Sequence, residues 1–463
     1  MAPQLTALIM AAGQGTRMRS SLPKVLHPVC GVPMVEWVIE AARAAGADRV
    51  VCITRPGSGV ADGLPNGVEV AEQTEGEGTG AAVLAAREAI EQSGDVIILS
   101  GDVPLTSAEL IEELVADHRR ERPAATLLTT EDLDPTSYGR IVRNDEGDVE
   151  RIVETKSTEG VPEEVLALRE INIGTYVFDA RALLKLDEVP VEESNGELYL
   201  TNIFPVLLKE AKVAAHRTDD TLSAMGINNR ADLMDVTRHA QRRILATHAR
   251  GGVTFTAPDT VAIDANVEIG EDTTIAAGVT LKHGTRIGER CQIGPQTTIS
   301  GCEIGDEVTI PHSVLVDCRV AKGATIGPFA YLRPEADVRE GAKVGTFVEV
   351  KKSTIHAGAK VPHLSYIGDA DVGANANLGA GTITANYHRG RKSRTTVGEG
   401  VHTGVHTALV APVHVGDEAY TGAGSVITED VPDGALAVSR PKDSQNHIEG
   451  YAERIAAEEQ QSK

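Results

Sequence analysis

Hydrophobic residues recur at every sixth position through the C-terminal half of the chain. Between residues 261 and 299, each step of this series carries a branched aliphatic side chain: Ile263, Ile269, Ile275, Leu281, Ile287, Ile293 and Ile299. An amphipathic α-helix repeats its apolar residues every three or four positions, and a half-buried strand repeats them every second position. A period of six is typical of a parallel β-helix, in which each hexapeptide forms one short strand and one corner. The pattern therefore predicts a solenoid with these side chains inside.

The series slips near Cys302 and at a few later points, and it resumes after each slip. Its later members are also branched and apolar: Ile304, Ile310, Val316, Ile326, Leu332, Val338, Val344, Val350, Ile355, Val361, Ile367, Val372 and Leu378. An ordinary sheet rich in Val and Ile is the alternative, but it would not keep a register over so many steps. We expect residues 252–437 to form this domain.

Two apolar runs in the N-terminal half end in residues suited to binding phosphate and metal. Residues 5–11 predict a buried parallel strand that enters the glycine-bearing loop 12–18, and residues 96–99 predict a strand that ends at Asp102. Glycine lets the backbone approach a phosphate, and Arg17 and Lys24 place two cations close behind the loop. In open α/β sheets ligands bind at the carboxyl ends of strands, where a carboxylate is a natural Mg²⁺ ligand.

Each of these features also has a simpler interpretation. The loop matches neither a Walker motif nor a dinucleotide fingerprint, so it can be a plain strand-to-helix turn. Asp102 can equally be the cap of the helix that follows. We expect residues 1–228 to form a Rossmann-like α/β domain.

Residues 229–251 join the two halves with a helical pattern. Leu233, Val236, Ala240 and Ile244 recur at helical spacing among charged and polar residues. Gly251 and the glycine after it stop the pattern. We interpret the segment as a linker helix; the alternative is the last helix of the first domain.

Composition narrows the possible partners. A length of 463 residues predicts two or more domains, and a net charge of −23 argues against nucleic acid as a partner. No run of 18 apolar residues and no N-terminal signal is present, so we expect a cytoplasmic protein without membrane insertion. The five cysteines form no CxxC pair and predict reduced thiols. We expect the acidic tail, residues 438–463, to be a frayed helix or disordered.

Arg333 and Lys351 predict an anion site on the solenoid. They lie eighteen residues apart, which is one coil of three hexapeptides, within an unbroken part of the register. They should therefore stack on adjacent coils, about 4.8 Å apart. Like charges so placed repel each other unless an anion lies between them. A bound phosphate is our interpretation, and two solvated surface cations are the alternative.

Several motifs together resemble a known enzyme family. Those in the first half are Ala11-Ala12-Gly13-x-Gly15-Thr16-Arg17-Met18, Leu22-Pro23-Lys24, Gln73 with Gly78-Thr79-Gly80, Gly101-Asp102-Val103-Pro104-Leu105, Tyr138-Gly139-Arg140 and Gly226-Ile227-Asn228-Asn229-Arg230. They resemble the sugar-1-phosphate nucleotidylyltransferases. With the hexapeptides, residues 5–440 resemble the bifunctional N-acetylglucosamine-1-phosphate uridylyltransferase/glucosamine-1-phosphate N-acetyltransferase family. This resemblance implies a left-handed β-helix, a homotrimer with active sites between prisms, and a role in UDP-N-acetylglucosamine synthesis for peptidoglycan.

The resemblance also implies roles for residues of the first half. Uracil would contact Ala11, Ala12, Gly13 and Gln73, and the nucleotide would lie against Gly78 and Thr79. Arg17 and Lys24 would bind the phosphates of UTP as catalytic cations. N-acetylglucosamine would be read by Gly139, Glu154 and Asn172, and Mg²⁺ would be held by Asp102 and Asn228. No protein nucleophile is required, because the sugar phosphate attacks the α-phosphorus directly.

For the second half, the resemblance implies an acetyltransferase site. Glucosamine-1-phosphate would be held by Arg333, Lys351, Tyr366 and Asn377. His363 would be the general base, with Glu349 orienting its ring. Acetyl-CoA would contact Ala380, Asn386, Tyr387, Val405, Ala423 and Arg440, and the basic residues Lys392 and Arg394 could reach its phosphates.

Some positions depart from the family pattern. Gln14 replaces a lysine, Ser100 a tyrosine, Glu77 a leucine, Ala81 a histidine and Val405 a serine. These changes put nucleotide and cofactor affinity in question but remove no metal ligand. Two other hypotheses stay open: a nucleotidylyltransferase for another sugar with a purely structural β-helix, and a non-catalytic trimeric scaffold.

Overall fold

The structure is a computed structural model that describes residues 4–153, 155, 161–192 and 196–439. It divides into two compact units, Met1–Ala246 and Thr247–Lys463. Two predicted site residues, Glu154 and Arg440, and nearly all of the predicted tail lie outside the described residues.

The first unit is built on a mixed sheet with the strand order β11-β7-β10-β6-β1-β4-β5. Its strands are β1 (Leu5–Met10), β4 (Arg49–Thr54), β5 (Glu69–Glu72), β6 (Asp95–Ser100), β7 (Ala125–Thr130), β10 (Ile171–Asp179) and β11 (Val213–Arg217), with the hairpin β8 (Arg140–Arg143) and β9 (Val149–Val153) attached to β10. Strand β1 lies parallel to β4 and β6, as both predicted strands require, whereas β10 runs antiparallel to β6 and β7.

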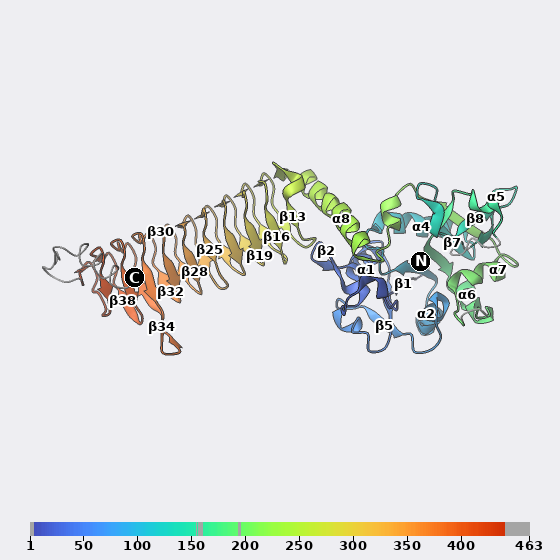
Figure 1. The fold of residues 1–463 in the computed structure, drawn as a ribbon, viewed down its shortest axis with the longest axis horizontal. Helices are drawn as coiled ribbons and strands as arrows, with labels where there is room; N and C mark the ends of the chain where they lie inside the picture. The colour runs from blue at the N-terminus through green and yellow to red at the C-terminus, as the bar shows by residue number, and fades with distance from the viewer. Residues whose placement is uncertain (1–3, 154, 156–160, 193–195, 440–463) are drawn as a thin grey trace, which may run out of the picture. The chain divides into compact units, whose positions relative to one another are not determined.

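Helices pack around this sheet (Figure 1). They are α1 (Met34–Ala44), α2 (Thr79–Ala85), α3 (Arg87–Glu91), α4 (Ala108–Glu121), α5 (Glu163–Leu166), α6 (Ala180–Leu183) and α7 (Phe204–Leu207). An aromatic cluster of Tyr176, Phe178 and Phe204 lies in the core, with ring centroids 5.5–5.9 Å apart. Because α2 and α4 each follow a loop at the carboxyl end of the sheet, the sheet and its helices fix those loops in place.

The second unit is a prism of three parallel sheets, seen in Figure 1 as a stack of coils. The first sheet contains β12 (Thr254–Phe255), β15 (Thr274–Ile275), β18 (Gln292–Ile293), β21 (Thr309–Ile310), β24 (Thr325–Ile326), β27 (Lys343–Thr346) and β30 (Lys360–His363). The second contains β13 (Ala262–Ile263), β16 (Thr280–Lys282), β19 (Thr298–Ser300), β22 (Val314–Val316), β25 (Tyr331–Leu332), β28 (Glu349–Lys351), β31 (Tyr366–Gly368), β33 (Ile383–Ala385), β37 (Ala408–Val410) and β40 (Val426–Ile427). The third contains β14 (Glu268–Ile269), β17 (Arg286–Ile287), β20 (Glu303–Ile304), β23 (Arg319–Val320), β26 (Asp337–Val338), β29 (Thr354–Ile355), β32 (Ala370–Val372), β36 (Thr395–Val397) and β38 (Val413–Val415).

The period-six aliphatic residues form the interior of this prism, as predicted, with one correction: in β22 the inward position is taken by Leu315, and the predicted Val316 is only partly buried because the preceding corner is one residue shorter. In the second sheet, Leu281 pairs with Ile299 and Ile299 with Leu315 on successive coils, and all three side chains are fully buried. Small hydroxyl residues form a second inward column; for example, Thr297 Oγ1 donates to the Ile310 carbonyl at 3.0 Å. Each slip of the register falls at a corner, where a shorter turn does not disturb the stacked strands.

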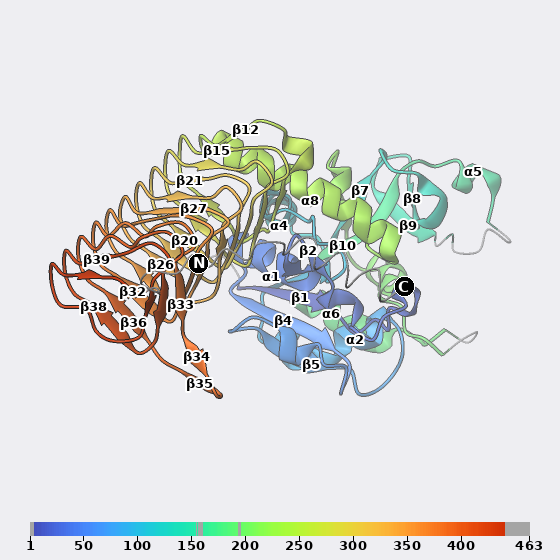
Figure 2. The same ribbon diagram turned by 60° about the vertical axis from the view of Figure 1, so that its left-hand side comes forward.

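One corner of the prism carries an inserted hairpin, β34 (Tyr387–His388) and β35 (Arg391–Lys392). Figures 1 and 2 show it standing away from the coils. It is the basic excursion noted in the sequence, and it brings Lys392 beside the second sheet.

The predicted helix between the two halves is confirmed as α8 (Arg230–Arg250). Its buried residues are Val236, Ala240, Ile244 and Leu245, which recur at helical spacing. Within the described part of the chain, no helix combines the length and apolar character needed to cross a membrane.

Adjacent residues of β22 allow a direct test of the packing. Leu315 is fully buried, and Val314 is 43% exposed. Leu315→Ala should lower the free energy of unfolding by about 2–5 kcal/mol because it leaves a cavity, and Val314→Ala should change it by less than about 0.5 kcal/mol. Urea denaturation of the full chain, followed by circular dichroism, measures both. Equal losses would contradict the inward position of Leu315.

Candidate active sites

A cavity of about 700 Å³ opens at the carboxyl ends of β1 and β6. It is lined by most of the predicted nucleotide and sugar residues: Ala12, Gly13, Arg17, Lys24, Gln73, Gly78, Thr79, Asp102, Gly139, Asn172 and Asn228. Ala11 does not line it; Ala11 is buried and donates its N–H to the Ile53 carbonyl at 2.9 Å. Segments distant in sequence therefore converge on one site.

Two cations and two oxygen ligands meet at one end of this cavity. Lys24 Nζ lies 2.5 Å from Asp102 Oδ2 and 3.5 Å from Asn228 Oδ1, and Arg17 donates to Asn228 Oδ1 at 3.0 Å. Gly15 has a φ of +61° and lies against Lys24: a Cβ at residue 15 would be 2.5 Å from the Lys24 Cβ. The loop can therefore pass this close to Lys24 only with glycine at that position.

These oxygens suit a magnesium ion. The carboxylate of Asp102 and the amide oxygen of Asn228 already approach one cation, the Lys24 ammonium. Mg²⁺ prefers oxygen ligands and commonly takes one or two from the protein and the rest from phosphates and water. Among the described residues, no group of three or more His, Cys, Asp or Glu side chains could hold a metal ion. A metal ion held by three such side chains therefore has no site in this part of the chain.

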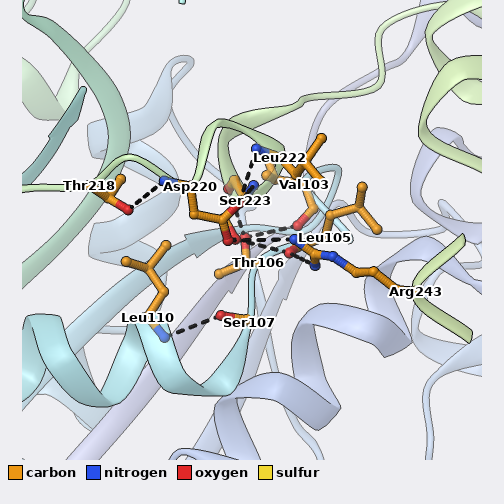
Figure 3. Close-up of polar contacts among 10 residues, drawn as sticks. All are labelled: Val103, Leu105, Thr106, Ser107, Leu110, Thr218, Asp220, Leu222, Ser223 and Arg243. Carbon is orange, nitrogen blue, oxygen red and sulfur yellow. Dashed lines mark hydrogen bonds and ion pairs between the residues drawn. The ribbon is translucent and has the colours of Figure 1, made fainter. Parts of the chain in front are cut away.

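A polar network holds the Asp102 loop against the segment that leads to Asn228. The Ile227 N–H donates to the Asp102 carbonyl at 2.9 Å. The Leu105 carbonyl accepts from Arg243 Nη1 at 2.6 Å and lies 3.0 Å from Ser223 Oγ (Figure 3). Arg243 belongs to α8, so this helix helps to position both predicted metal ligands. Sequence patterns gave no signal for this role of Ser223 or Arg243, because the partner that they share, Leu105, is over 100 residues away.

The alternative role of Asp102 as a helix cap is wrong. The next helix, α4, begins at Ala108, and its N-cap is Ser107, whose Oγ accepts from the Leu110 N–H at 3.2 Å (Figure 3). The side chain of Asp102 is left to face Lys24 in the cavity.

Gln73, Gly78 and Thr79, predicted to contact the base and the nucleotide, also line the cavity. Gln73 is buried and donates Nε2 to the Gly76 carbonyl at 3.1 Å. Gly78 has a φ of +99°, and a Cβ there would lie 2.4 Å from the Leu198 carbonyl oxygen. Thr79 Oγ1 accepts from the Leu200 N–H at 2.9 Å. The strand-to-helix turn before α2 therefore depends on glycine and is fixed by residues 198–200.

The predicted sugar-binding residues are tied to each other. The Asn172 N–H donates to the Gly139 carbonyl at 2.9 Å, and Asn172 Nδ2 donates to Tyr176 Oη at 2.7 Å. Tyr176 also lines the cavity, and its ring packs in the aromatic core. The orientation of the Asn172 amide is thereby set from the core.

On the solenoid, the structure confirms that Arg333 and Lys351 follow paired positions of adjacent coils, because Leu332 pairs with Val350. Arg333 Nη1 forms an ion pair with Glu349 Oε1 at 2.9 Å. The Lys392 ammonium beside Lys351 holds the pKa of Lys351 below its usual value, and burial and Arg333 act in the same direction. Three cations, Arg333, Lys351 and Lys392, thus lie near one another, with the carboxylates of Glu349 and Asp369 beside them. An anion that replaced a carboxylate here would find several cationic donors.

The expected partner of His363 is engaged elsewhere. Glu349 pairs with Arg333, so the proposed orientation of His363 by Glu349 stays a prediction. His363 is exposed at the end of β30.

His363 shares one corner column with three predicted acetyl-CoA residues. The Gly381 N–H donates to the His363 carbonyl, the His406 N–H to that of Ala380, and the Gly424 N–H to that of Val405. This ladder stacks the residues on successive coils in the order His363, Ala380, Val405, Ala423. A ligand that lies along the prism axis at this corner would contact all four.

The other predicted residues lie on both sides of that corner. Tyr366 pairs with Glu349 in the second sheet, and Asn386 Nδ2 lies 3.4 Å from Tyr366 Oη. Asn377 instead forms isolated β-bridges with Lys360 and His402 on the neighbouring coils, in line with the first sheet. Tyr387 is 66% exposed on the inserted hairpin. One chain therefore presents the predicted acetyltransferase residues on two adjoining faces.

Comparisons with known proteins agree with this two-part arrangement. Residues 7–164 match the MobA-like NTP transferase domain, and residues 284–318 match the bacterial transferase hexapeptide family (six repeats). The fold and sites thus define a transferase with an NTP-transferase domain followed by a left-handed β-helix of hexapeptides.

Full-length relatives specify the family. The chain is 42% identical to the bifunctional protein GlmU of Listeria monocytogenes serotype 4b over 97% of this chain and 98% of that protein. It is 43% identical to that of Brevibacillus brevis over 95% of each chain, and 42% identical to that of Caldanaerobacter subterraneus over 97% and 98%. The chain belongs to the family of bifunctional GlmU proteins.

The cation pair on the solenoid can be tested by a double-mutant cycle. Arg333→Ala and Lys351→Ala should each raise the Michaelis constant for glucosamine-1-phosphate by roughly tenfold, since each removes a charged hydrogen-bond donor. The double mutant should be less than additive if both cations bind one phosphate, as predicted.

Lys352→Ala is the matched control, because Lys352 is the next residue and forms its ion pair with Glu335 instead. Equal acetylation of glucosamine and glucosamine-1-phosphate by the unaltered protein would contradict a phosphate site here.

Proposed function

We infer that the protein is a bifunctional enzyme of UDP-N-acetylglucosamine synthesis. The β-helix transfers an acetyl group from acetyl-CoA to glucosamine-1-phosphate. The N-terminal domain then transfers a uridylyl group from UTP to N-acetylglucosamine-1-phosphate and releases pyrophosphate, with Mg²⁺ as cofactor. The observation that carries this proposal is membership of one bifunctional family over 97% of the chain, combined with a polar site in each unit. The product would supply peptidoglycan synthesis.

In uridylyl transfer, the protein positions two anionic substrates. Arg17 and Lys24 would bind the triphosphate, and Gly139 and Asn172 would hold the sugar at the other end of the cavity. An oxygen of the sugar phosphate attacks the α-phosphorus in line, and pyrophosphate leaves. The charge that spreads in the transition state is stabilised by the two cations. Bound at Asp102 and Asn228, Mg²⁺ would supply further positive charge, and Lys24 would exchange its carboxylate partner for phosphate.

In acetyl transfer, His363 would accept the proton of the substrate amine as its nitrogen attacks the thioester carbonyl. An imidazole suits this step near neutral pH. Coenzyme A leaves as the thiol. The column His363–Ala380–Val405–Ala423 supports this arrangement, because a cofactor along it would present its acetyl group beside the imidazole. Val405 offers no hydroxyl donor, so one hydrogen bond expected from the family would be missing.

The trimer and the cytoplasmic location are also part of this proposal. The acetyltransferase residues of one chain lie on two adjoining faces, which suits a site completed by a neighbouring prism. An exposed apolar column next to His363, consisting of Phe329, Phe347 and Leu364, supports contact between prisms. The five free, buried cysteines suit a reducing compartment.

The two activities should separate by mutation. Asp102→Ala should abolish Mg²⁺-dependent pyrophosphate release from UTP and N-acetylglucosamine-1-phosphate, because it removes the only charged oxygen ligand proposed for the metal. Thiol release from acetyl-CoA and glucosamine-1-phosphate should stay near that of the unaltered protein. Loss of both activities in a folded variant would contradict the two-site proposal. Full retention of both would show that Asp102 is not a metal ligand.

His363→Ala should lower the acetyl-transfer turnover by about 10²–10⁴-fold, the usual contribution of a general base. Part of the rate should return at high pH, where solvent can take the proton. Steady-state thiol release across a pH series measures both effects. His356→Ala is a suitable control, because it removes another exposed histidine of the solenoid. Unchanged turnover in His363→Ala would show that another group takes the proton.

A further inference from the structure

Two residues in the wall of the nucleotide cavity have no role in the mechanism above. Arg55 directly follows β4, and Glu77 directly precedes the Gly78–Thr79 turn; both line the cavity. Arg55 Nη2 lies 2.6 Å from Glu77 Oε2, and Nη1 lies 3.4 Å from Glu77 Oε1. The remaining donor, Arg55 Nε, donates to the Ala12 carbonyl at 2.8 Å. All three guanidinium nitrogens are therefore engaged.

These contacts join the loop proposed to hold the uracil base to the turn proposed to lie against the nucleotide. Ala12 belongs to the loop after β1, and Glu77 belongs to the turn before α2. The turn is fixed on its far side, where the Leu198 N–H donates to the Glu77 carbonyl at 2.8 Å. Arg55 thus links the Ala12 loop to an anchored turn, and a planar guanidinium with three directed bonds sets the distance between them more strictly than one bond would.

Arg55 also changes the charge of the site. Glu77 adds a carboxylate to a cavity that would bind a triphosphate, and unpaired it would repel the ligand. The glycine loop has Gln14 where the family pattern expects a lysine, so it carries one positive charge less. Arg55 neutralises Glu77, so the ion pair adds no net charge to this wall. The ion pair therefore accounts for the carboxylate at residue 77 but does not replace the charge that is missing at residue 14.

We propose that Arg55 is a positioning residue for UTP, which fixes the Ala12 loop against the Glu77–Thr79 turn so that the slot between them accepts uracil. This inference rests on the proposed uridylyl transfer. Arg55 does not touch the reacting atoms, so its loss affects nucleotide affinity and base selection rather than turnover. Binding of the sugar phosphate, which uses Gly139 and Asn172, is independent of it.

The test compares UTP with its 5-methyl analogue, which differs only at the edge of the base. Arg55→Ala should raise both the calorimetric Kd and the Michaelis constant for UTP by about tenfold and reduce discrimination against 5-methyl-UTP by several-fold. The turnover number and the Michaelis constant for N-acetylglucosamine-1-phosphate should change less than twofold. Arg55→Lys should be intermediate, because an ammonium cannot make three directed bonds.

Arg49→Ala is the matched control. Arg49 lies at the other end of β4 and also forms a two-bond ion pair, with Glu69 at 2.6 and 2.9 Å, but it does not line the cavity. It should leave UTP affinity and base discrimination unchanged. Acetyl transfer and thermal unfolding, measured on each variant, report on folding.

A further variant separates positioning from charge. Arg55→Ala/Glu77→Gln removes the unpaired carboxylate, but the Ala12 carbonyl still lacks the hydrogen bond from Arg55. UTP affinity should therefore recover only in part. Complete recovery of affinity and discrimination would overturn the positioning role, as would an Arg55→Ala variant with normal UTP affinity. A protein that binds UTP but transfers no uridylyl group would refute the proposed function alone, because the effect of Arg55 on UTP binding would still be measured.

Discussion

Everything on the solenoid depends on the backbone hydrogen bonds between one coil and the next. The aliphatic interior alone would allow the coils to slide past each other, but each N–H that donates to the carbonyl of the coil beneath fixes the register. The ladder through His363, Ala380 and Val405 is the clearest case. Because the register is preserved from coil to coil, residues that occupy the same place in their coils line up along the prism, even when they are far apart in the chain.

The N-terminal domain also brings together residues that are far apart in the chain, but in a different way. There, parallel strands deliver several loops to one edge of the sheet, and side chains from distant segments hold those loops together. Arg243 and Ser223 at the Leu105 carbonyl serve the metal end, and Arg55 serves the base end. Each of these side chains donates to a backbone carbonyl, and Arg55 also bonds the Glu77 carboxylate. The side chains that hold the site therefore act in part on the path of the chain itself.

The sequence predicted those parts of the structure that repeat or that stay local. The period of six gave the prism, and the spacing of Arg333 and Lys351 placed them on adjacent coils, since both follow from the geometry of a repeat. The apolar runs gave β1 and β6, but not the antiparallel β10, whose direction depends on the whole sheet. The partner of Glu349 was not foreseeable either. In the structure Glu349 pairs with Arg333 of the preceding coil, a side-chain contact that the repeat alone does not determine.

The inserted hairpin shows how the two requirements of this domain, a rigid frame and an adaptable surface, are kept apart. Thr354 pairs with Asp371, and Asp371 pairs with Thr396, so the second step is eight residues longer than the first, yet the pairing beyond it continues. Extra chain at a corner is thus absorbed without a change in the frame. Such corners are sites where evolution can lengthen, shorten or recharge a loop and so alter what the surface binds, while the stability of the domain is left to the strands.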